Sequence, residues 1–137
     1  MIGDIFDRVA DAAQSAISSV KDTVQNNGTT KQRKLAMQWL NKGKDCYNTR
    51  SYEKAEEFFR RALTEDPAYA RAHAYLGNAL YKQGRPEEAL EEWQKAVICE
   101  PDSDAARKAQ EKIDNLKAQT ATINRTLQEG LGFRETR

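Results

Sequence analysis

The same residue types return along the chain after 34 residues, and this periodicity constrains the fold more than any other feature of the sequence. The recurring residues are Ala36, Gly43, Tyr47, Glu53, Ala55, Glu57, Ala62 and Pro67, with counterparts Ala70, Gly77, Tyr81, Glu87, Ala89, Glu91, Ala96 and Pro101. Phe59 and Trp93 are also equivalent, aromatic for aromatic. A fixed period of roughly 20 to 50 residues indicates one structural unit repeated side by side.

Each recurring residue type suits two antiparallel helices that pack closely. A residue without a bulky side chain, such as Gly43 or Ala55, lets two helix backbones approach, and an aromatic such as Phe59 fills the space between helices. Pro67 is predicted to end the second helix of its unit because proline lacks the N–H that a continuing helix needs. Ser51 is a candidate N-cap for that helix.

These residues, at this spacing, resemble the tetratricopeptide repeat, whose pattern is an early aromatic, then Gly, Ala, an aromatic, Ala and a closing Pro. The resemblance covers residues 36–101, about half of the chain, and implies an all-α fold in which helical hairpins stack as a right-handed α-solenoid. Two positions depart from the pattern. His73 stands where the first repeat has Trp39, and Lys42 stands where the second repeat has Leu76.

The rest of the chain divides into flanking segments. We expect an amphipathic N-terminal helix at 1–27, a linker with the start of a repeat helix at 28–35, repeats at 36–69 and 70–103, a capping helix at 104–128 and a flexible tail at 129–137. The predicted helices span 3–25, 31–48, 52–65, 68–83, 86–99 and 103–128. The last of these places Ala106, Ala109, Ile113, Leu116, Ile123 and Leu127 on one apolar stripe. Because the end of a solenoid needs a polar outer face, this helix is predicted to cap the repeats.

Composition limits the classes of protein to which the chain can belong. With 22 basic and 21 acidic residues the net charge is +1, so no overall field selects nucleic acid, and the KQRK run at 31–34 is too short to do so. No apolar run approaches the roughly 20 residues needed to cross a bilayer. The N-terminus is acidic where a secretory signal would be basic and then apolar. We therefore expect a cytoplasmic protein.

The sequence contains no arrangement typical of an active site, a cofactor site or a metal site. His73 is the single histidine and falls at a helix-packing position, so a structural role is expected. Cys46 and Cys99 lack metal-ligand spacing and are interpreted as core residues. The carboxylates interpreted as solvated helix faces are Glu56, Glu57, Glu87, Glu88, Glu91 and Glu92. No catalytic residue, cofactor or metal is predicted, and the chain is not expected to be an enzyme.

In the family that the chain resembles, the first helices of successive repeats line a concave groove that holds a segment of a partner protein. Carried over by resemblance, the partner-binding positions are Met37, Leu40, Asn41, Lys44, Tyr47, Asn48, Arg71, Ala74, Tyr75, Asn78, Tyr81 and Lys82, joined by Lys108 and Lys112 of the capping helix. This mixture of positive charge, amide groups and tyrosine suits an acidic peptide. Two plainer interpretations stay open: these side chains can form ordinary solvated helix faces, and Tyr47 and Tyr81 can belong to the core.

The two-lysine, two-asparagine carboxylate clamp of chaperone-binding family members is not reproduced. Leu40 stands where a clamp lysine belongs, Lys44 stands where its asparagine belongs, and Tyr75 replaces a second asparagine. Binding of a chaperone's acidic C-terminal tail is therefore disfavoured.

Residues 1–27 carry an apolar stripe at helical spacing, and a stripe this regular must be buried against something. It includes Ile2, Ile5, Phe6, Val9, Ile17 and Val20. The helix can pack on the repeats or in their groove, pair with a second copy through a near-heptad pattern, or lie on a membrane surface. With two basic and four acidic residues, its net charge of −2 opposes anionic lipid and suits a basic groove.

Two functional hypotheses follow. The first is a non-enzymatic adaptor, or an assembly or chaperone-like factor, that binds a peptide segment of a partner protein in a basic, tyrosine-containing groove. The second is a targeting or self-assembling scaffold, in which the N-terminal helix attaches the repeats to a membrane surface or to a second copy. Neither hypothesis involves nucleic acid.

Overall fold

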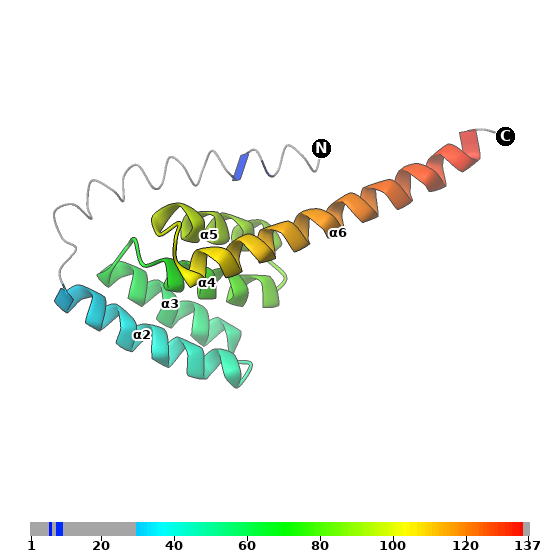
Figure 1. The fold of residues 1–137 in the computed structure, drawn as a ribbon. Helices are drawn as coiled ribbons and strands as arrows, with labels where there is room; N and C mark the ends of the chain where they lie inside the picture. Colours follow the sequence, from blue (N-terminus) through cyan, green and yellow to red (C-terminus); the bar gives the residue numbers. More distant parts are fainter. Residues whose placement is uncertain (1–5, 7, 10–29, 136–137) are drawn as a thin grey trace.

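The computed structural model describes Phe6, Arg8, Val9 and residues 30–135, with side chains described as far as Gly130. Within residues 30–135 the chain forms α-helices joined by short turns, and no strand occurs there. The helices are α2 (Thr30–Asn48), α3 (Tyr52–Glu65), α4 (Ala70–Lys82), α5 (Pro86–Cys99) and α6 (Asp104–Glu135) (Figure 1). The all-α repeat fold expected from the periodicity is confirmed.

The helices form two stacked hairpins followed by one long helix. α2 packs against α3, α4 packs against α5, and α3 joins the hairpins by packing against α4. The first half of α6 covers α5 and α4, and its second half extends away from the other helices (Figure 1). The helices predicted at 52–65 and 86–99 coincide with α3 and α5.

Each hairpin is closed by an aromatic ring that lies on a glycine. A Cβ atom added at Gly43 would lie 2.4 Å from Phe59 Cε1, and one added at Gly77 would lie 2.5 Å from Trp93 Cδ1. The sequence predicted that glycine would let two backbones approach. The structure shows that the space is used by the ring from the second helix instead, which explains why glycine and aromatic recur together.

Alanine supplies the tight contacts elsewhere in the core. The alanines of the repeat pattern are each 0% exposed, namely Ala36, Ala55, Ala62, Ala70, Ala89 and Ala96. Because a methyl group adds little bulk, helices that meet through alanine approach closely over their whole length. The larger buried side chains, among them Leu40, Leu76 and Ile113, fill the gaps between these contacts.

The first repeat ends the solenoid with a polar face. In the second repeat, Ala72, Leu76 and Ala79 are fully buried because the first repeat packs against them. Their counterparts 34 residues earlier are Gln38, Lys42 and Asp45, and all of these are exposed. The departure of Lys42 from the repeat pattern is thereby explained, since a charge in water carries no desolvation cost there.

Two local predictions need correction. α3 begins after Ser51 as expected, but the Ser51 side chain makes no capping hydrogen bond. The capping helix was predicted to end at 128, whereas α6 continues to Glu135. A glycine inside a helix, here Gly130, costs about 1 kcal/mol relative to alanine and does not by itself end the helix. No proline follows Pro101 to stop it.

The turn inside each hairpin is also repeated. Arg50 has a φ of 64° and Gly84, its counterpart 34 residues later, has a φ of 78°. Both lie in the left-handed region, which glycine adopts without steric cost and an arginine does not. At this equivalent turn position the first repeat therefore has a strained residue, Arg50, and the second repeat has glycine, Gly84.

Candidate functional site

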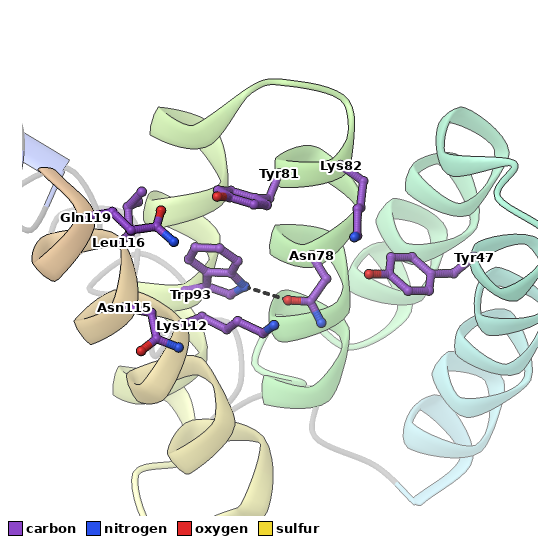
Figure 2. Close-up of a pocket in the computed structure, with 9 residues that line it drawn as sticks. All are labelled: Tyr47, Asn78, Tyr81, Lys82, Trp93, Lys112, Asn115, Leu116 and Gln119. Atoms are coloured by element: carbon purple, nitrogen blue, oxygen red, sulfur yellow. Dashed lines mark hydrogen bonds between the residues drawn. The ribbon is translucent and has the colours of Figure 1, made fainter. Parts of the chain in front are cut away.

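Two cavities lie along the surface to which α2, α4 and α6 contribute, and we call this surface the concave groove. The larger cavity is about 530 Å³, and the predicted positions that line it are Arg71, Ala74, Tyr75, Asn78 and Lys108. The smaller cavity is about 150 Å³, and the predicted positions that line it are Tyr47, Asn78, Tyr81, Lys82 and Lys112 (Figure 2). Asn78 lines both, so the two cavities adjoin at α4, and together they are called the track.

Some predicted positions lie outside these cavities. Leu40 is 2% exposed and belongs to the core, so the transfer of a groove role to this position is wrong. Met37, Asn41 and Asn48 are exposed on α2 but line neither cavity. Lys44 is half-buried, and its Nζ lies 5.6 Å from the centroid of the Tyr75 ring, at the edge of the larger cavity.

Aromatic contacts hold the groove tyrosines in place. The Tyr75 ring stacks on Phe59 with 5.6 Å between ring centroids, and the Tyr81 ring lies 5.7 Å from Trp93. Tyr81 is 41% exposed, so it is a surface residue supported by the core rather than a core residue. Rings held in this way offer stiff contact area to a ligand, since little side-chain entropy is lost on binding.

Asn78 is oriented by a hydrogen bond from the core. Trp93 Nε1 donates to Asn78 Oδ1 at 3.0 Å (Figure 2). Because Trp93 Nε1 can only donate, the oxygen of the Asn78 amide must face Trp93 and the amide nitrogen must lie on the other side. The amide NH₂ group, which can only donate, is left for a group that lies in the groove.

Part of the wall of the larger cavity is an ion-pair cluster around Arg33. Arg33 donates to Asp66 and, at 2.9 Å, to Glu100 Oε1, and its guanidinium lies 4.4 Å from the centroid of the Tyr69 ring. Burial alone would lower the pKa of Arg33, but the hydrogen bonds to Asp66 and Glu100 outweigh burial and raise it. Arg33 is therefore charged and already satisfied by the chain itself.

The other cations of the groove have no such partners. Within the described residues, no carboxylate forms an ion pair with Arg71, Lys82, Lys108 or Lys112. The acidic residues that line the larger cavity are Glu100 and Asp104, which pair with Arg33 and Arg107 respectively. As far as the described residues go, the groove thus presents cations that no carboxylate of the chain compensates.

The sequence reasoning missed several lining residues. They are Arg33, Tyr69, Glu100, Ser103, Asp104 and Ala105 in the larger cavity, and Trp93, Asn115, Leu116 and Gln119 in the smaller one. A signal for part of the wall was present, since an acidic residue precedes the closing proline of both repeats, at Asp66 and at Glu100. Arg33 contacts both carboxylates, but it lies before the periodic region and has no counterpart in the pattern.

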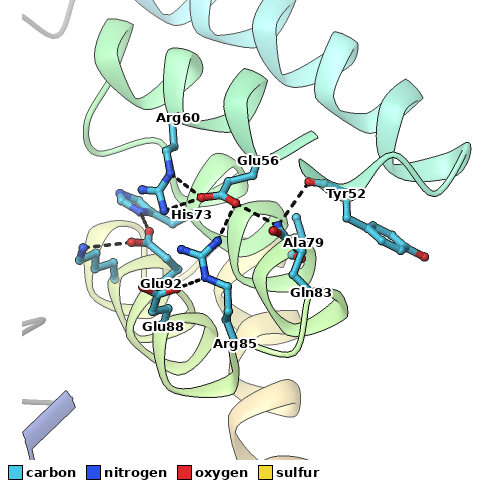
Figure 3. A network of polar contacts seen from close by, with 10 residues as sticks. Tyr52, Glu56, Arg60, His73, Ala79, Gln83, Arg85, Glu88 and Glu92 are labelled. Atoms are coloured by element: carbon cyan, nitrogen blue, oxygen red, sulfur yellow. Dashed lines mark hydrogen bonds and ion pairs between the residues drawn. The ribbon is translucent and has the colours of Figure 1, made fainter. Parts of the chain in front are cut away.

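The expected structural role of His73 agrees with its burial, while two of the carboxylates differ from expectation. His73 is 6% exposed, and Glu92, interpreted as part of a solvated face, is only 8% exposed because it bonds to His73 and Lys95 (Figure 3). Glu56 is also largely covered, accepting hydrogen bonds from Arg60, Gln83 and Arg85 (Figure 3). These carboxylates tie helices together.

Part of the predicted N-terminal stripe lies on the repeats. Phe6 and Val9 are half-buried and pack against the hydrophobic core, and Lys117 Nζ lies 5.4 Å from the centroid of the Phe6 ring. The stripe positions Ile2, Ile5, Ile17 and Val20 lie outside the described residues.

In the part of the chain that the structure describes, no three His, Cys, Asp or Glu side chains are grouped to hold a metal ion. Cys46 and Cys99 are free and half-buried, and both pack against the hydrophobic core. Over the same residues, no helix combines the length and apolar character that crossing a bilayer requires.

Comparison with known proteins agrees with this architecture. A family model described as tetratricopeptide repeat matches residues 50–113. Small glutamine-rich tetratricopeptide repeat-containing protein 2 of Saccharomyces cerevisiae is 30% identical over 96 residues, which cover 69% of this chain and 28% of that protein. Its namesake from Mycosarcoma maydis is 33% identical over 57 residues, which cover 42% of this chain and 16% of that protein. The chain thus spans less than a third of these relatives, and with its stacked hairpins it belongs to the tetratricopeptide-repeat family.

Proposed function

We propose that the chain is a non-enzymatic adaptor that binds an acidic segment of a partner protein in the concave groove. The observation that carries the proposal is the row of cations without carboxylate partners, formed by Arg71, Lys82, Lys108 and Lys112. Cations that have no carboxylate partner among the described residues pair readily with carboxylates of a ligand.

The rest of the groove supports an extended ligand. The lining of the larger cavity combines Ala74 and the Tyr75 ring with the cations Arg71 and Lys108. An apolar side chain of the ligand would enter this cavity while neighbouring carboxylates pair with the two cations. The Asn78 NH₂ group lies where the track crosses α4 and would donate to a carbonyl oxygen of the ligand.

Fluorescence anisotropy with a labelled peptide tests the proposal. The probe is a twelve-residue peptide that alternates Glu with Leu, and the reference is the same peptide with Gln in place of Glu. Arg71→Ala with Lys108→Ala should weaken binding of the acidic probe roughly tenfold, because an exposed charge pair contributes up to about 1 kcal/mol. The acidic probe should also lose affinity as salt rises.

A matched control removes two charges elsewhere. Lys54→Ala with Arg125→Ala changes two exposed cations that line neither cavity, so affinity should stay within about twofold of the parent. Equal binding of the acidic and neutral probes, or equal losses in both double variants, would contradict a cationic groove.

The scaffold hypothesis remains a second candidate with a weaker basis. Phe6 and Val9 contact the core of their own chain, which favours packing of this stripe on the repeats over insertion into lipid. Co-sedimentation with vesicles, with and without residues 1–27, separates the two. Pelleting that depends on residues 1–27 would support membrane attachment, and no pelleting of either form would remove it.

A further inference from the structure

The second half of α6 carries an apolar surface that the rest of the described chain leaves uncovered. Ile123 is 55% exposed and Leu127 is 59% exposed, more than any other large hydrophobic residue whose side chain the structure describes. Both lie where α6 extends beyond the repeats (Figure 1). Leucine and isoleucine on a water-exposed helix are a cost that burial would remove.

The spacing of this stripe is that of a helix-pairing seam. Leu116, Thr120, Ile123 and Leu127 follow one another at intervals of four, three and four residues. Such alternation keeps one edge of a helix facing a neighbouring helix. The seam is bordered in the projecting half by Asn124 and Thr126, which are uncharged. Nearer the repeats it is bordered by Gln119 and by Lys117, whose Nζ lies over the Phe6 ring. Two copies of the projecting half can therefore meet without like-charge repulsion along these borders.

We propose that α6 pairs antiparallel with α6 of a second copy, forming a twofold-symmetric dimer. A heterologous arrangement is disfavoured because the far end of the solenoid presents the polar residues Gln38, Lys42 and Asp45. The pairing of one surface with itself is the geometry of an isologous dimer.

The antiparallel direction follows from where the repeats are attached. The hairpins pack on the first half of α6, so a parallel pair would bring both sets of repeats to the same end (Figure 1). An antiparallel pair places them at opposite ends. Ile123 then faces Leu127 of the partner subunit. Gly130, around which no atom lies within 4 Å of an added Cβ, is opposite the partner's Thr120 and permits close approach.

The seam is short, which sets the strength of the dimer. A pair built on this length of helix buries less than the roughly 1,200 Å² of a standard interface, so a weak, concentration-dependent dimer is expected. The dimer would carry two grooves and so bind a partner with two acidic segments more tightly than one groove alone. The pairing itself does not depend on what the groove binds.

Sedimentation equilibrium of the full chain across the micromolar range tests the pairing. The parent should pass from monomer to dimer, and Ile123→Asp with Leu127→Asp should stay monomeric with unchanged helix content by circular dichroism. The control, Ala118→Asp with Thr122→Asp, introduces two charges at the same spacing on exposed positions away from the seam. This control should dimerise like the parent.

Two further measurements exclude other modes of association. Ile17→Asp with Val20→Asp alters the N-terminal stripe and should leave the dimer intact. A genetically encoded spin label at Glu111 should report a separation of roughly 40 Å between copies, given a helical rise of about 1.5 Å per residue on either side of a centre near Arg125. The proposal would be overturned by a parent chain that stays monomeric, or by a dimer that survives Ile123→Asp with Leu127→Asp. It would equally be overturned by loss of the dimer in the Ile17→Asp, Val20→Asp variant, or by a label separation under roughly 20 Å.

Discussion

His73 and Glu92 form a buried ion pair in which His73 Nδ1 lies 2.7 Å from Glu92 Oε2. The other ring nitrogen, Nε2, lies 2.8 Å from the carbonyl oxygen of Pro67. Because a carboxylate and a carbonyl both accept, both ring nitrogens carry protons and the ring is an imidazolium. Burial alone would lower the pKa of His73, but the contacts with Cys99 and Glu92 outweigh it and raise the pKa to about 9.

The first prediction is that stability falls on the alkaline side. The pKa of His73 is about 9 in the folded chain and about 6.5 when unfolded. The contribution of His73 is therefore complete below about pH 6.5 and is lost as pH rises through about 9. Urea unfolding at a series of pH values should show the free energy of unfolding decreasing by at most about 3 kcal/mol over this window.

The charges around the pair define the control for this measurement. Lys95 Nζ lies 3.1 Å from Glu92 Oε1, so Glu92 stays ionised and its pKa is lowered, despite burial, by His73 and Lys95. His73→Gln should be less stable than the parent at pH 6 and should show a much flatter profile between pH 6.5 and 9. A parent profile that is flat over the same range would contradict a protonated His73.

The second prediction concerns the glycines beneath the aromatic rings. Gly43→Ala and Gly77→Ala should each lower the free energy of unfolding by about 1–3 kcal/mol, because the new methyl group overlaps Phe59 or Trp93. Gly77→Ala should cost more, since its Cβ would also lie 3.1 Å from the backbone oxygen of Ala89. Urea unfolding midpoints provide the comparison, provided that the m value, which is the slope of the free energy of unfolding against urea concentration, is the same in each variant.

Gly130→Ala is the matched control for these substitutions. Gly130 is also helical, but a Cβ added there meets open space. In the monomer its replacement should therefore be neutral or stabilising by up to about 1 kcal/mol, through helix propensity alone, so the variants are compared at a concentration at which the chain is monomeric. If Gly43→Ala behaved like Gly130→Ala, the close ring-on-glycine contact would be wrong.

The third prediction uses the two equivalent turns. Arg50→Gly should stabilise the chain by about 0.5–1 kcal/mol, because a left-handed arginine is strained where glycine is not. Gly84→Ala should destabilise by a similar amount, although nothing lies within 4 Å of the added Cβ. Thermal and urea unfolding of both variants check the opposite signs, and equal signs would refute a conformational origin.

The periodicity was sufficient for the helices because it encodes local, regular requirements. Gly43 and Phe59 recur together because each hairpin needs the same ring-on-glycine contact, and Pro67 and Pro101 close each unit by the loss of an N–H. The bounds of α3 and α5 could therefore be predicted from the chain alone. The end of α6 at Glu135 could not be predicted in this way, because this part of the chain has no equivalent position in the two repeats.

The groove was only partly predictable, for a physical reason. Helical spacing places Arg71, Tyr75 and Asn78 on α4, but whether a cation is free depends on which carboxylates the fold brings near it. Arg33 forms ion pairs with two acidic residues that are 33 and 67 positions away in sequence, while Arg71 has no carboxylate partner among the described residues. Leu40 shows the same limit, since only packing decided that it faces the core.

The sequence by itself determined the helical repeat and the hairpins, because these depend on residue size, backbone freedom and short-range spacing, whereas the polar end at Lys42 was recognised only from the packing of the repeats. Tertiary structure alone decided the ionisation of His73, the burial of Glu92 and the pairing state of each groove cation. Charge interactions in a protein depend on distance and burial, and both are set only when helices that are distant in sequence come together.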